Sequence, residues 1–383
     1  MLNTEKKGRK LRKAVIGLAV LVAVLGAAIG VFQFKSPLEA VLTPEKVENL
    51  SAEACYSQIS LKWDKVSHAK GYEVLEKDML SGDSYESIGK TSGENHFTIE
   101  NYDRDSRHEY CVVAYGKDPF NGKEYDGEMS DPVEAYYDMD SFAQKIPVLA
   151  YHAVSAGSEK PTTGLCVSEV DFEEQMKYLS DNGFTTVTMD EFRQWHAGKK
   201  EFPPKSCLIT FDDGLDSVYY LAYPILKKYD QAATLFVIGH RIGDKTDPFD
   251  PDSEESHYVG RDVIDKVRAE YPRFEFESHT YNMHKRINGR KPVNVLNYDE
   301  MVADSKKNAS FGFTYMAYPW GAYNESMQKA LEDTGYEMAF AYRPYRYTTR
   351  DDDPYAISRI KVNGTKSIDK FIAIVNGDRK DDQ

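Results

Sequence analysis

The sequence predicts a multidomain chain with an N-terminal transmembrane helix, an all-β sandwich and an α/β barrel. Three observations support this prediction: a long uncharged apolar run, a middle region with period-two alternation, and a C-terminal region in which strands and helices alternate. The 383 residues exceed the usual size of one domain. We expect an anchor with its basic tail, a linker, a sandwich and a barrel at 1–35, 36–43, 44–138 and 139–383.

The N-terminal region has the pattern of a membrane anchor. Residues 14–32 are nineteen residues without a charge, and at ~1.5 Å per residue a helix of this length nearly spans a hydrocarbon core of ~30 Å. Six basic residues precede the run and only Lys35 follows it directly, which predicts a cytoplasmic N-terminus. A cleaved signal peptide is the competing interpretation, because residues 26–28 are small, but its apolar core usually has only ~7–15 residues. We therefore expect an uncleaved single-pass membrane anchor and a body outside the cytoplasm.

The charge of the chain argues against one class of partner. The net charge is −14, and because residues 1–13 carry +5, the rest of the chain carries −19. A body with this charge repels a phosphate backbone, so we expect no nucleic-acid partner. The same charge places no restriction on a neutral glycan.

Four cysteines divide equally between the two folded regions. Cys55 and Cys111 fall in the middle region, and Cys166 and Cys207 fall in the C-terminal region. Outside the cytoplasm such residues can pair, but the sequence does not decide between the connectivities. No CxxC spacing suggests a zinc or redox motif.

The middle region consists of short strands separated by turns. The expected strands are 59–63, 72–76, 96–100, 110–115 and 132–136. Their length, alternation and spacing are typical of a β-sandwich. The region resembles a fibronectin type III domain in its Trp63 strand, in the segment AKGYEV and in the late strand that ends at Tyr115. The resemblance implies a spacer or binding platform without a catalytic role.

After Met139 the pattern changes to alternating strands and helices. The expected strands are 147–152, 207–211, 233–238, 274–277, 315–318 and 338–341. The first helix has Ser168 as its N-cap and an apolar face built on Phe172, Met176 and Leu179. Repeated strand–helix units joined by short loops predict a parallel sheet, here with enough strands to close a barrel.

Polar side chains follow four of these strands, at the position where active sites of α/β barrels lie. The residues concerned are His152, Asp212, Asp213, His279 with His284, and the tripeptide 319–321. Two adjacent carboxylates are costly unless a cation neutralises them. One Asp with two His is a ligand set suited to a catalytic divalent metal. Each signal alone is usually a turn or a structural His, but their joint placement favours a catalytic site.

Three segments carry a resemblance to a known family, namely TFDDG at 210–214, SHTYNMH at 278–284 and AYPWG at 317–321. Together they resemble the polysaccharide deacetylases of carbohydrate esterase family 4, the NodB homology domain, over roughly residues 146–376. The resemblance implies a distorted (β/α) barrel with Asp212 as the general base. It also implies a divalent metal, usually zinc, with Asp213, His279 and His284 as ligands.

The chain departs from the common family pattern at three points. The two histidines are five residues apart rather than four, no Arg stands ahead of Pro319, and no late Leu-x-Leu-x-His motif is present because His284 is the last histidine. A branch that resembles the poly-N-acetylglucosamine deacetylases shares the five-residue gap, a Tyr-His pattern and a YPxG motif. In that branch the early His is the general acid, which implies His152. His240 follows a strand and is the competing candidate.

The resemblance implies hydrolysis of N-acetyl groups from N-acetylglucosamine residues of an extracellular or cell-wall polysaccharide, with release of acetate. The loop containing Tyr318, Pro319 and Trp320 is expected to hold the oxyanion, and Trp320 is placed to stack on a sugar, although core packing explains one Trp equally well. Two alternatives stay open. The same site suits an O-acetyl polysaccharide esterase, and the missing late His leaves room for a non-catalytic cell-surface glycan-binding protein.

Overall fold

The computed structural model describes residues 37–378 except 81, 83, 160, 254 and 343–345. The chain divides into two compact units, Met1–Tyr137 and Asp138–Gln383. The apolar run 14–32, which we predict to be a membrane anchor, lies outside the described residues. Within the described part of the chain, no helix is both long enough and apolar enough to cross a membrane.

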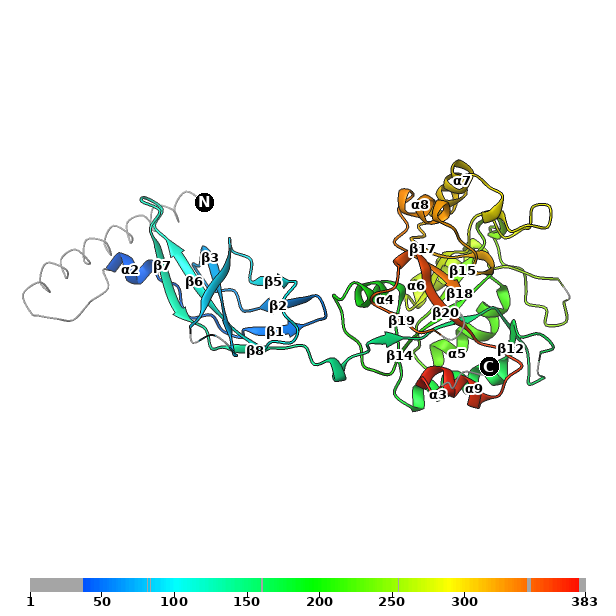
Figure 1. The fold of residues 1–383 in the computed structure, drawn as a ribbon, viewed down its shortest axis with the longest axis horizontal. Coiled ribbons are helices and arrows are strands. Elements are labelled where there is room, and N and C mark those ends of the chain that lie inside the picture. Colours follow the sequence, from blue (N-terminus) through cyan, green and yellow to red (C-terminus); the bar gives the residue numbers. More distant parts are fainter. Residues whose placement is uncertain are drawn as a thin grey trace, which may run out of the picture. The chain divides into compact units, whose positions relative to one another are not determined.

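The first unit is built from two antiparallel sheets (Figure 1). A short helix, α2 (Pro37–Leu42), precedes a three-stranded sheet of β1 (Ser51–Ala54), β2 (Gln58–Lys62) and β5 (His96–Glu100). The second sheet contains β3 (Gly71–Asp78), β4 (Glu86–Thr91), β6 (His108–Lys117), β7 (Glu124–Met129) and β8 (Val133–Ala135). Ile59, Leu61, Trp63, Tyr72 and Val112 form a shared apolar core, so the alternation in this region reflects two sheets that each bury one face.

The second unit contains a closed ring of seven parallel strands. In ring order they are β10 (Val148–Tyr151), β20 (Ile357–Lys361), β18 (Met338–Tyr342), β17 (Tyr315–Ala317), β16 (Phe274–Ser278), β15 (Ala233–Val237) and β14 (Ser206–Phe211). The ring closes because β10 pairs with both β14 and β20, with Val148 opposite Leu208 and Leu149 opposite Ile360. The predicted α/β barrel is therefore confirmed.

Several shorter segments complete this unit. Outside the ring, β13 (Thr185–Thr186) pairs with β14, β11 (Ala153–Ser155) pairs with β12 (Cys166–Ser168), and β9 (Lys145–Ile146) pairs with β19 (Thr348–Thr349). The single-turn helices are η1 (Met139–Ser141), η3 (Gly239–Arg241), η4 (Pro292–Asn294), η5 (Pro319–Gly321) and η6 (Pro354–Ala356), and η2 (Val218–Ala222) is a π-helical segment.

The seventh strand, β20, was not among the strands expected from the sequence. Its residues Ser358 and Arg359 are fully buried, although the segment ISRIK lacks the apolar run of the other barrel strands. A strand that buries polar side chains inside the ring hides the hydrophobic pattern on which strand prediction depends.

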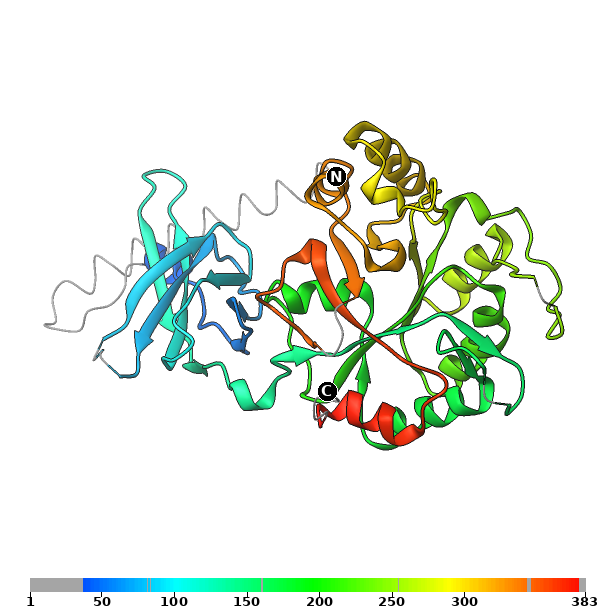
Figure 2. The same cartoon turned by 45° about the vertical axis from the view of Figure 1, so that its right-hand side comes forward.

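Helices surround the ring (Figure 2). They are α3 (Glu169–Asp181), α4 (Met189–His196), α5 (Tyr223–Lys228), α6 (Arg261–Glu270), α7 (Tyr298–Ala309), α8 (Glu325–Asp333) and α9 (Ile368–Asn376). Ser168 caps α3 as the sequence indicates, since its Oγ accepts the N–H of Asp171 at 3.1 Å. Capping boxes at Thr188 and Asn297 start α4 and α7.

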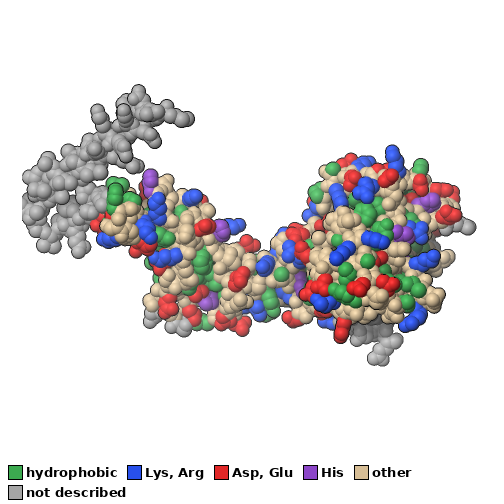
Figure 3. All heavy atoms as spheres, turned by 90° about the horizontal axis from the view of Figure 1, so that it is seen from above, with side chains coloured by type: hydrophobic (Ala, Val, Ile, Leu, Met, Phe, Trp, Pro, Cys, Tyr) green, Lys and Arg blue, Asp and Glu red, His purple; other side chains and the backbone are tan. Residues whose placement is uncertain are grey.

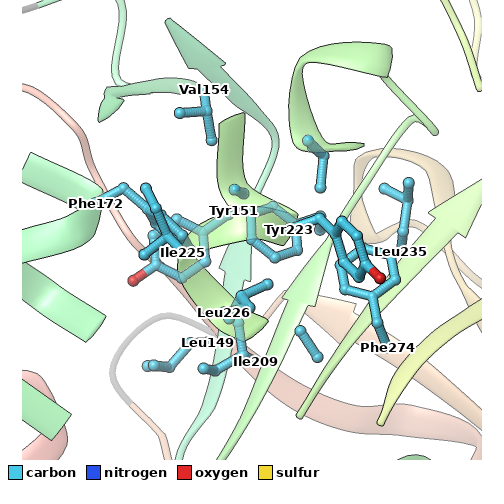
Figure 4. Packing of buried hydrophobic residues seen from close by; sticks show 14 of the residues in the cluster. Leu149, Tyr151, Val154, Phe172, Ile209, Tyr223, Ile225, Leu226, Leu235 and Phe274 are labelled. Atoms are coloured by element: carbon cyan, nitrogen blue, oxygen red, sulfur yellow. The ribbon is translucent and has the colours of Figure 1, made fainter. Parts of the chain in front are cut away.

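The barrel core lies between the ring and its helices. Figure 4 shows Leu149 and Ile209 from neighbouring strands beside Phe172, Ile225 and Leu226 from the helices. Full burial of one such side chain contributes roughly 1.5–3 kcal/mol. This packing holds the strands in place, so that the loops at their carboxyl ends can carry polar groups.

The structure leaves the two intradomain cysteine pairs unformed. Cys111, Cys166 and Cys207 are free thiols, so neither Cys55 with Cys111 nor Cys166 with Cys207 makes a disulfide. Each unit by itself is stabilised by apolar packing and hydrogen bonds.

Candidate active site

The carboxyl ends of the barrel strands border a cavity of about 780 Å³. His152 follows β10, Asp212 and Asp213 follow β14, and His279 follows β16, so the ring brings together residues that are far apart in the sequence. His284 reaches the same cavity from the loop after β16, and Trp320 reaches it from η5. The sequence-predicted residues that line it are therefore His152, Asp212, Asp213, His279, His284 and Trp320.

Asp213, His279 and His284 form one compact group of possible metal ligands. Their ligand atoms all lie within 4.8 Å of one another. Nε2 of His279 is 3.4 Å from Oδ1 of Asp213, and Nε2 of His284 is 3.2 Å from the same oxygen. Nδ1 of His279 donates its proton to the carbonyl oxygen of Ala317 at 2.8 Å, which leaves a lone pair on Nε2 in the neutral ring.

The chemistry of this group fits a divalent cation. Oδ1 of Asp213 is buried and accepts no hydrogen bond within the described part of the chain. In the neutral tautomer the lone pair of His279 Nε2 faces this oxygen, and two facing lone pairs repel unless a cation or a proton lies between them. Burial lowers the pKa of His279, but Asp212 and Asp213 outweigh that effect and raise this pKa above its usual value. The pocket therefore attracts positive charge.

Backbone strain concentrates around the ligand group. Asp213, Thr280 and Trp320 are non-glycine residues with positive φ, at 75°, 67° and 54°. Such conformations cost of order 1–3 kcal/mol each and persist only where the surroundings impose them. At Gly321, φ is +62° and an added Cβ would lie 2.6 Å from the backbone nitrogen of Tyr342, so only glycine lets this loop approach β18.

The loop between the two histidines is folded around Asp304, a residue of α7. Oδ2 of Asp304 accepts the N–H of Tyr281 and Oδ1 accepts the N–H of Asn282, both at 2.8 Å. Asp304 thereby turns the chain so that His284 converges on His279 in spite of the five-residue separation. The sequence interpretation did not identify Asp304, because its spacing on α7 is that of an ordinary helix surface residue.

Asp212, the neighbour of Asp213, has a different environment. Arg359 donates to both of its oxygens, with Nη1 at 2.7 Å from Oδ1 and Nη2 at 2.8 Å from Oδ2. The hydroxyl of Tyr342 donates to Oδ2 at 2.8 Å. Burial alone would raise the pKa of Asp212, but Arg359 and His279 hold it well below its usual range, so the carboxyl is ionised at neutral pH.

Arg359 and Tyr342 are site residues that the sequence interpretation missed. Arg359 is completely buried, and its guanidinium lies over the rings of Tyr342 and Phe236. No Arg stands ahead of Pro319 in this chain, and the arginine that contacts Asp212 comes from β20, a different strand of the ring. The only sequence signal was an Arg within an apolar segment, ISRIKV, in the region where the late His motif is missing.

The structure separates the two histidines considered as general acid. Nε2 of His152 lies 3.9 Å from Oδ2 of Asp212 and 3.5 Å from the hydroxyl of Tyr342. Burial lowers the pKa of His152 below its usual value. His240 is exposed and its Nδ1 lies 2.8 Å from the carbonyl oxygen of Tyr281, and it is not among the residues that line the cavity.

The loop 318–321 contributes to the cavity through Trp320. The indole of Trp320 stacks on His284 with ring centroids 4.8 Å apart. Tyr318 and Pro319 are buried outside this cavity, where the Tyr318 hydroxyl donates to the carbonyl oxygen of Tyr355 at 2.9 Å. The N–H groups of Tyr318 and Gly321 already donate to carbonyl oxygens, and Pro319 has none, so Trp320 is the residue of this segment whose N–H has no described backbone acceptor.

Comparison with known proteins gives matches over the barrel. Residues 199–339 match the family model for "Polysaccharide deacetylase". The chain is 37% identical over 235 residues to a "Putative polysaccharide deacetylase YxkH" of Bacillus subtilis, an alignment that covers 60% of this chain and 76% of that protein. It is 30% identical over 220 residues to a "Poly-beta-1,6-N-acetyl-D-glucosamine N-deacetylase" of Staphylococcus aureus, covering 54% of this chain and 71% of that protein.

A solved structure gives a further match. The "Structure of IcaB from Ammonifex degensii" is similar over 61% of this chain and 97% of that chain, with 26% identity and a TM-score of 0.50.

Proposed function

Because the chain belongs to the polysaccharide deacetylase family, we propose that its barrel hydrolyses N-acetyl groups of N-acetylglucosamine residues in an extracellular or cell-wall polysaccharide and releases acetate. The observation that carries this proposal is the placement of two different carboxylates in one cavity. Asp213 joins two histidines in a group suited to a metal, and Asp212 stands beside it, ionised and held by Arg359. The similarity to poly-β-1,6-N-acetylglucosamine deacetylases favours a β-linked N-acetylglucosamine polymer.

Asp213, His279 and His284 would hold the metal, which we assign as zinc from the nitrogen-rich donor set. When bound, such a metal polarises the acetamide carbonyl and lowers the pKa of a water molecule. The tautomer of His279 is already set for this role by its hydrogen bond to Ala317.

The remaining steps belong to residues around the metal group. Asp212 accepts a proton from the attacking water, and Arg359 and Tyr342 hold its carboxylate in one orientation. The N–H of Trp320 donates to the oxyanion that forms when water adds to the carbonyl carbon. The Tyr342 hydroxyl lies 2.8 Å from Oδ2 of Asp212 and 3.5 Å from Nε2 of His152, so this contact can pass the proton from Asp212 to His152. His152 donates that proton to the amine nitrogen as the C–N bond breaks.

We assign the other parts of the chain supporting roles. The apolar run 14–32 would anchor the chain in a membrane, with the N-terminus in the cytoplasm and the barrel outside it. The sandwich unit would serve as a fibronectin type III-like spacer, an assignment supported by its two antiparallel sheets and by its resemblance in sequence.

Acetate release by the full-length chain in detergent tests the proposal. The substrates are β-1,6- and β-1,4-linked N-acetylglucosamine oligomers and an O-acetylated oligomer of equal length, and each is assayed with zinc and with a chelator. We expect release that the chelator abolishes and that zinc restores, with the preferred linkage identifying the type of polymer. No release by zinc-loaded protein would contradict the proposal, and release only from O-acetylated oligomers would indicate an esterase. Failure to bind zinc would favour a glycan-binding protein.

A further inference from the structure

The cavity extends from the metal group to a mostly apolar recess beside β20 and α9, which we call the annex. The annex is lined by Leu165, Gln175, Ile360, Val362, Phe371 and Ile374. Apart from Leu165, which is 49% exposed, each of these residues is more than nine-tenths buried. Because so little of each side chain is open to solvent, the annex suits a small substituent rather than a whole sugar ring.

Gln175 of α3 is the polar residue of the annex. Its Oε1 accepts the hydroxyl of Tyr151 at 2.7 Å, which is the one side-chain hydrogen bond that Gln175 makes to a described residue. The Nε2 amino group of Gln175 therefore has two protons and no acceptor within the described part of the chain. A buried donor without an acceptor is costly, so Gln175 favours a ligand that brings an acceptor into the annex.

The annex lies beside the proposed general acid. Tyr151, the partner of Gln175, directly precedes His152, and Ile360 of β20 pairs with Leu149 of the same strand β10. In the proposed reaction His152 donates to the amine nitrogen, and this nitrogen joins the acetyl group to the sugar. A substrate placed in this way has its sugar, and the next sugar of the polymer, toward the annex.

An acetamide matches the annex in both of its parts. Its methyl group suits the apolar walls, and its carbonyl oxygen can accept from Nε2 of Gln175. A free amine is cationic at neutral pH and would lose its hydration there, since the described carboxylates that line the cavity are Asp212 and Asp213. On the face of the second unit visible in Figure 3, apolar side chains lie among acidic and basic ones. The annex thus differs from that surface in composition.

We infer that the annex binds the intact acetamide of the sugar next to the one that is deacetylated. Gln175 is then a specificity-determining residue. This inference rests on the proposed deacetylase function and deepens it, because the site recognises two consecutive N-acetylglucosamine residues and hydrolyses one acetyl group. A sugar whose neighbour has already lost its acetyl group becomes a poor substrate. Mass-spectrometric sequencing of a partly deacetylated polymer should show fewer consecutive amines than random placement gives, and random placement would contradict the inference.

Tetrasaccharides with the linkage that the deacetylase assay prefers test the inference on the unaltered chain. One has two adjacent N-acetylglucosamine residues with glucose at the other positions. Two others have a single N-acetylglucosamine, at one or the other of those positions, and glucose elsewhere. We expect kcat/KM for acetate release to be about tenfold higher for the adjacent pair than for the better single-acetamide form. A ratio of about two or less, which the second reactive acetamide alone explains, would overturn the inference.

A matched pair of variants isolates the donor of Gln175. Tyr151→Phe removes the hydrogen bond between the two residues but keeps the amide of Gln175, and should retain the preference for the adjacent pair. Tyr151→Phe/Gln175→Met removes the amide as well and leaves no hydroxyl unpaired. In this double variant the preference should fall to about twofold. The same preference in both variants would show that Gln175 does not recognise the neighbouring sugar.

Binding separates failure of this inference from failure of the enzyme assignment. If no tetrasaccharide yields acetate, calorimetric titration of the full-length zinc-loaded chain with the adjacent-pair and single-acetamide forms still measures the annex. Tighter binding of the adjacent pair that is lost in Tyr151→Phe/Gln175→Met but kept in Tyr151→Phe supports the inference. Equal binding of the forms refutes it.

Discussion

Asp212 and Asp213 both follow β14, but the residues around them differ, and we call the two groups the Asp212 side and the Asp213 side. The Asp212 side consists of Asp212, Tyr342 and Arg359; Oδ1 of the carboxylate accepts one hydrogen bond and Oδ2 accepts two. The Asp213 side consists of Asp213, His279 and His284, where a buried carboxylate oxygen has only imidazole nitrogens near it. Two adjacent and chemically identical residues thus have different surroundings. The charge of Asp212 is balanced by Arg359, whereas Asp213 and its two histidines are suited to hold a cation.

The same Asp→Asn substitution on each side should give the largest difference between the two sides. Asp213→Asn should abolish zinc binding and activity together, because it removes the carboxylate of the group Asp213, His279 and His284. Asp212→Asn should retain zinc and lower kcat by roughly 10²–10⁴-fold, because an amide cannot accept the proton. Calorimetric zinc titration and acetate release measure both effects. If Asp212→Asn loses zinc as severely as Asp213→Asn, the two sides are not functionally distinct.

His152, the proposed general acid, lies on the Asp212 side, and its replacement should give the next largest effect. His152→Ala should slow N-deacetylation by about 10²–10⁴-fold with zinc affinity preserved. His240→Ala is the matched control, since His240 lies outside the cavity and should leave the rate close to that of the unaltered chain. Acetate release at saturating substrate distinguishes them, and the reverse pattern would transfer the role to His240.

Replacing Arg359 tests whether the Asp212 side depends on this counterion. Arg359→Met leaves a buried carboxylate without its partner and should destabilise the barrel by about 3–5 kcal/mol. It should also lower kcat, because the orientation of Asp212 is lost. Arg350→Met removes the cation of another well-buried pair, with Glu201, and should cost comparable stability. Denaturant unfolding and acetate release measure the two quantities. Equal activity in the two variants would show that Arg359 has no positioning role.

Replacing Asp304, which is not a ligand, tests whether the loop before His284 must be held in place for zinc to bind. Asp304→Asn weakens the hydrogen bonds that shape the loop before His284, and we expect about 10–100-fold weaker zinc binding. Excess zinc should restore most of the activity, as it would not for Asp212→Asn. Zinc titration followed by an activity assay checks both statements. Unchanged zinc affinity would mean that the loop keeps its shape without Asp304.

The Asp213 side was largely predictable from the sequence, whereas the Asp212 side was not. Asp213, His279 and His284 follow strands with clear apolar patterns, so the rule that barrel sites lie at strand ends brings them together. Arg359 lies within a strand that the sequence did not reveal, and its inward direction depends on the closure of the ring between β10 and β20. Tyr342 ends a predicted strand, but nothing in local sequence indicates that its hydroxyl faces Asp212, because that contact joins residues 130 positions apart.

The closure of the ring has a consequence for how the protein matures. Asp212 and its counterion Arg359 are separated by 147 positions, and the strand that carries Arg359 is the last to enter the ring. During synthesis from the N-terminus, Asp212 is therefore made long before Arg359 is available to balance its charge. Molecules that lack β20 should leave the ring open between β10 and β18. We therefore expect only chains that include β20 to be active.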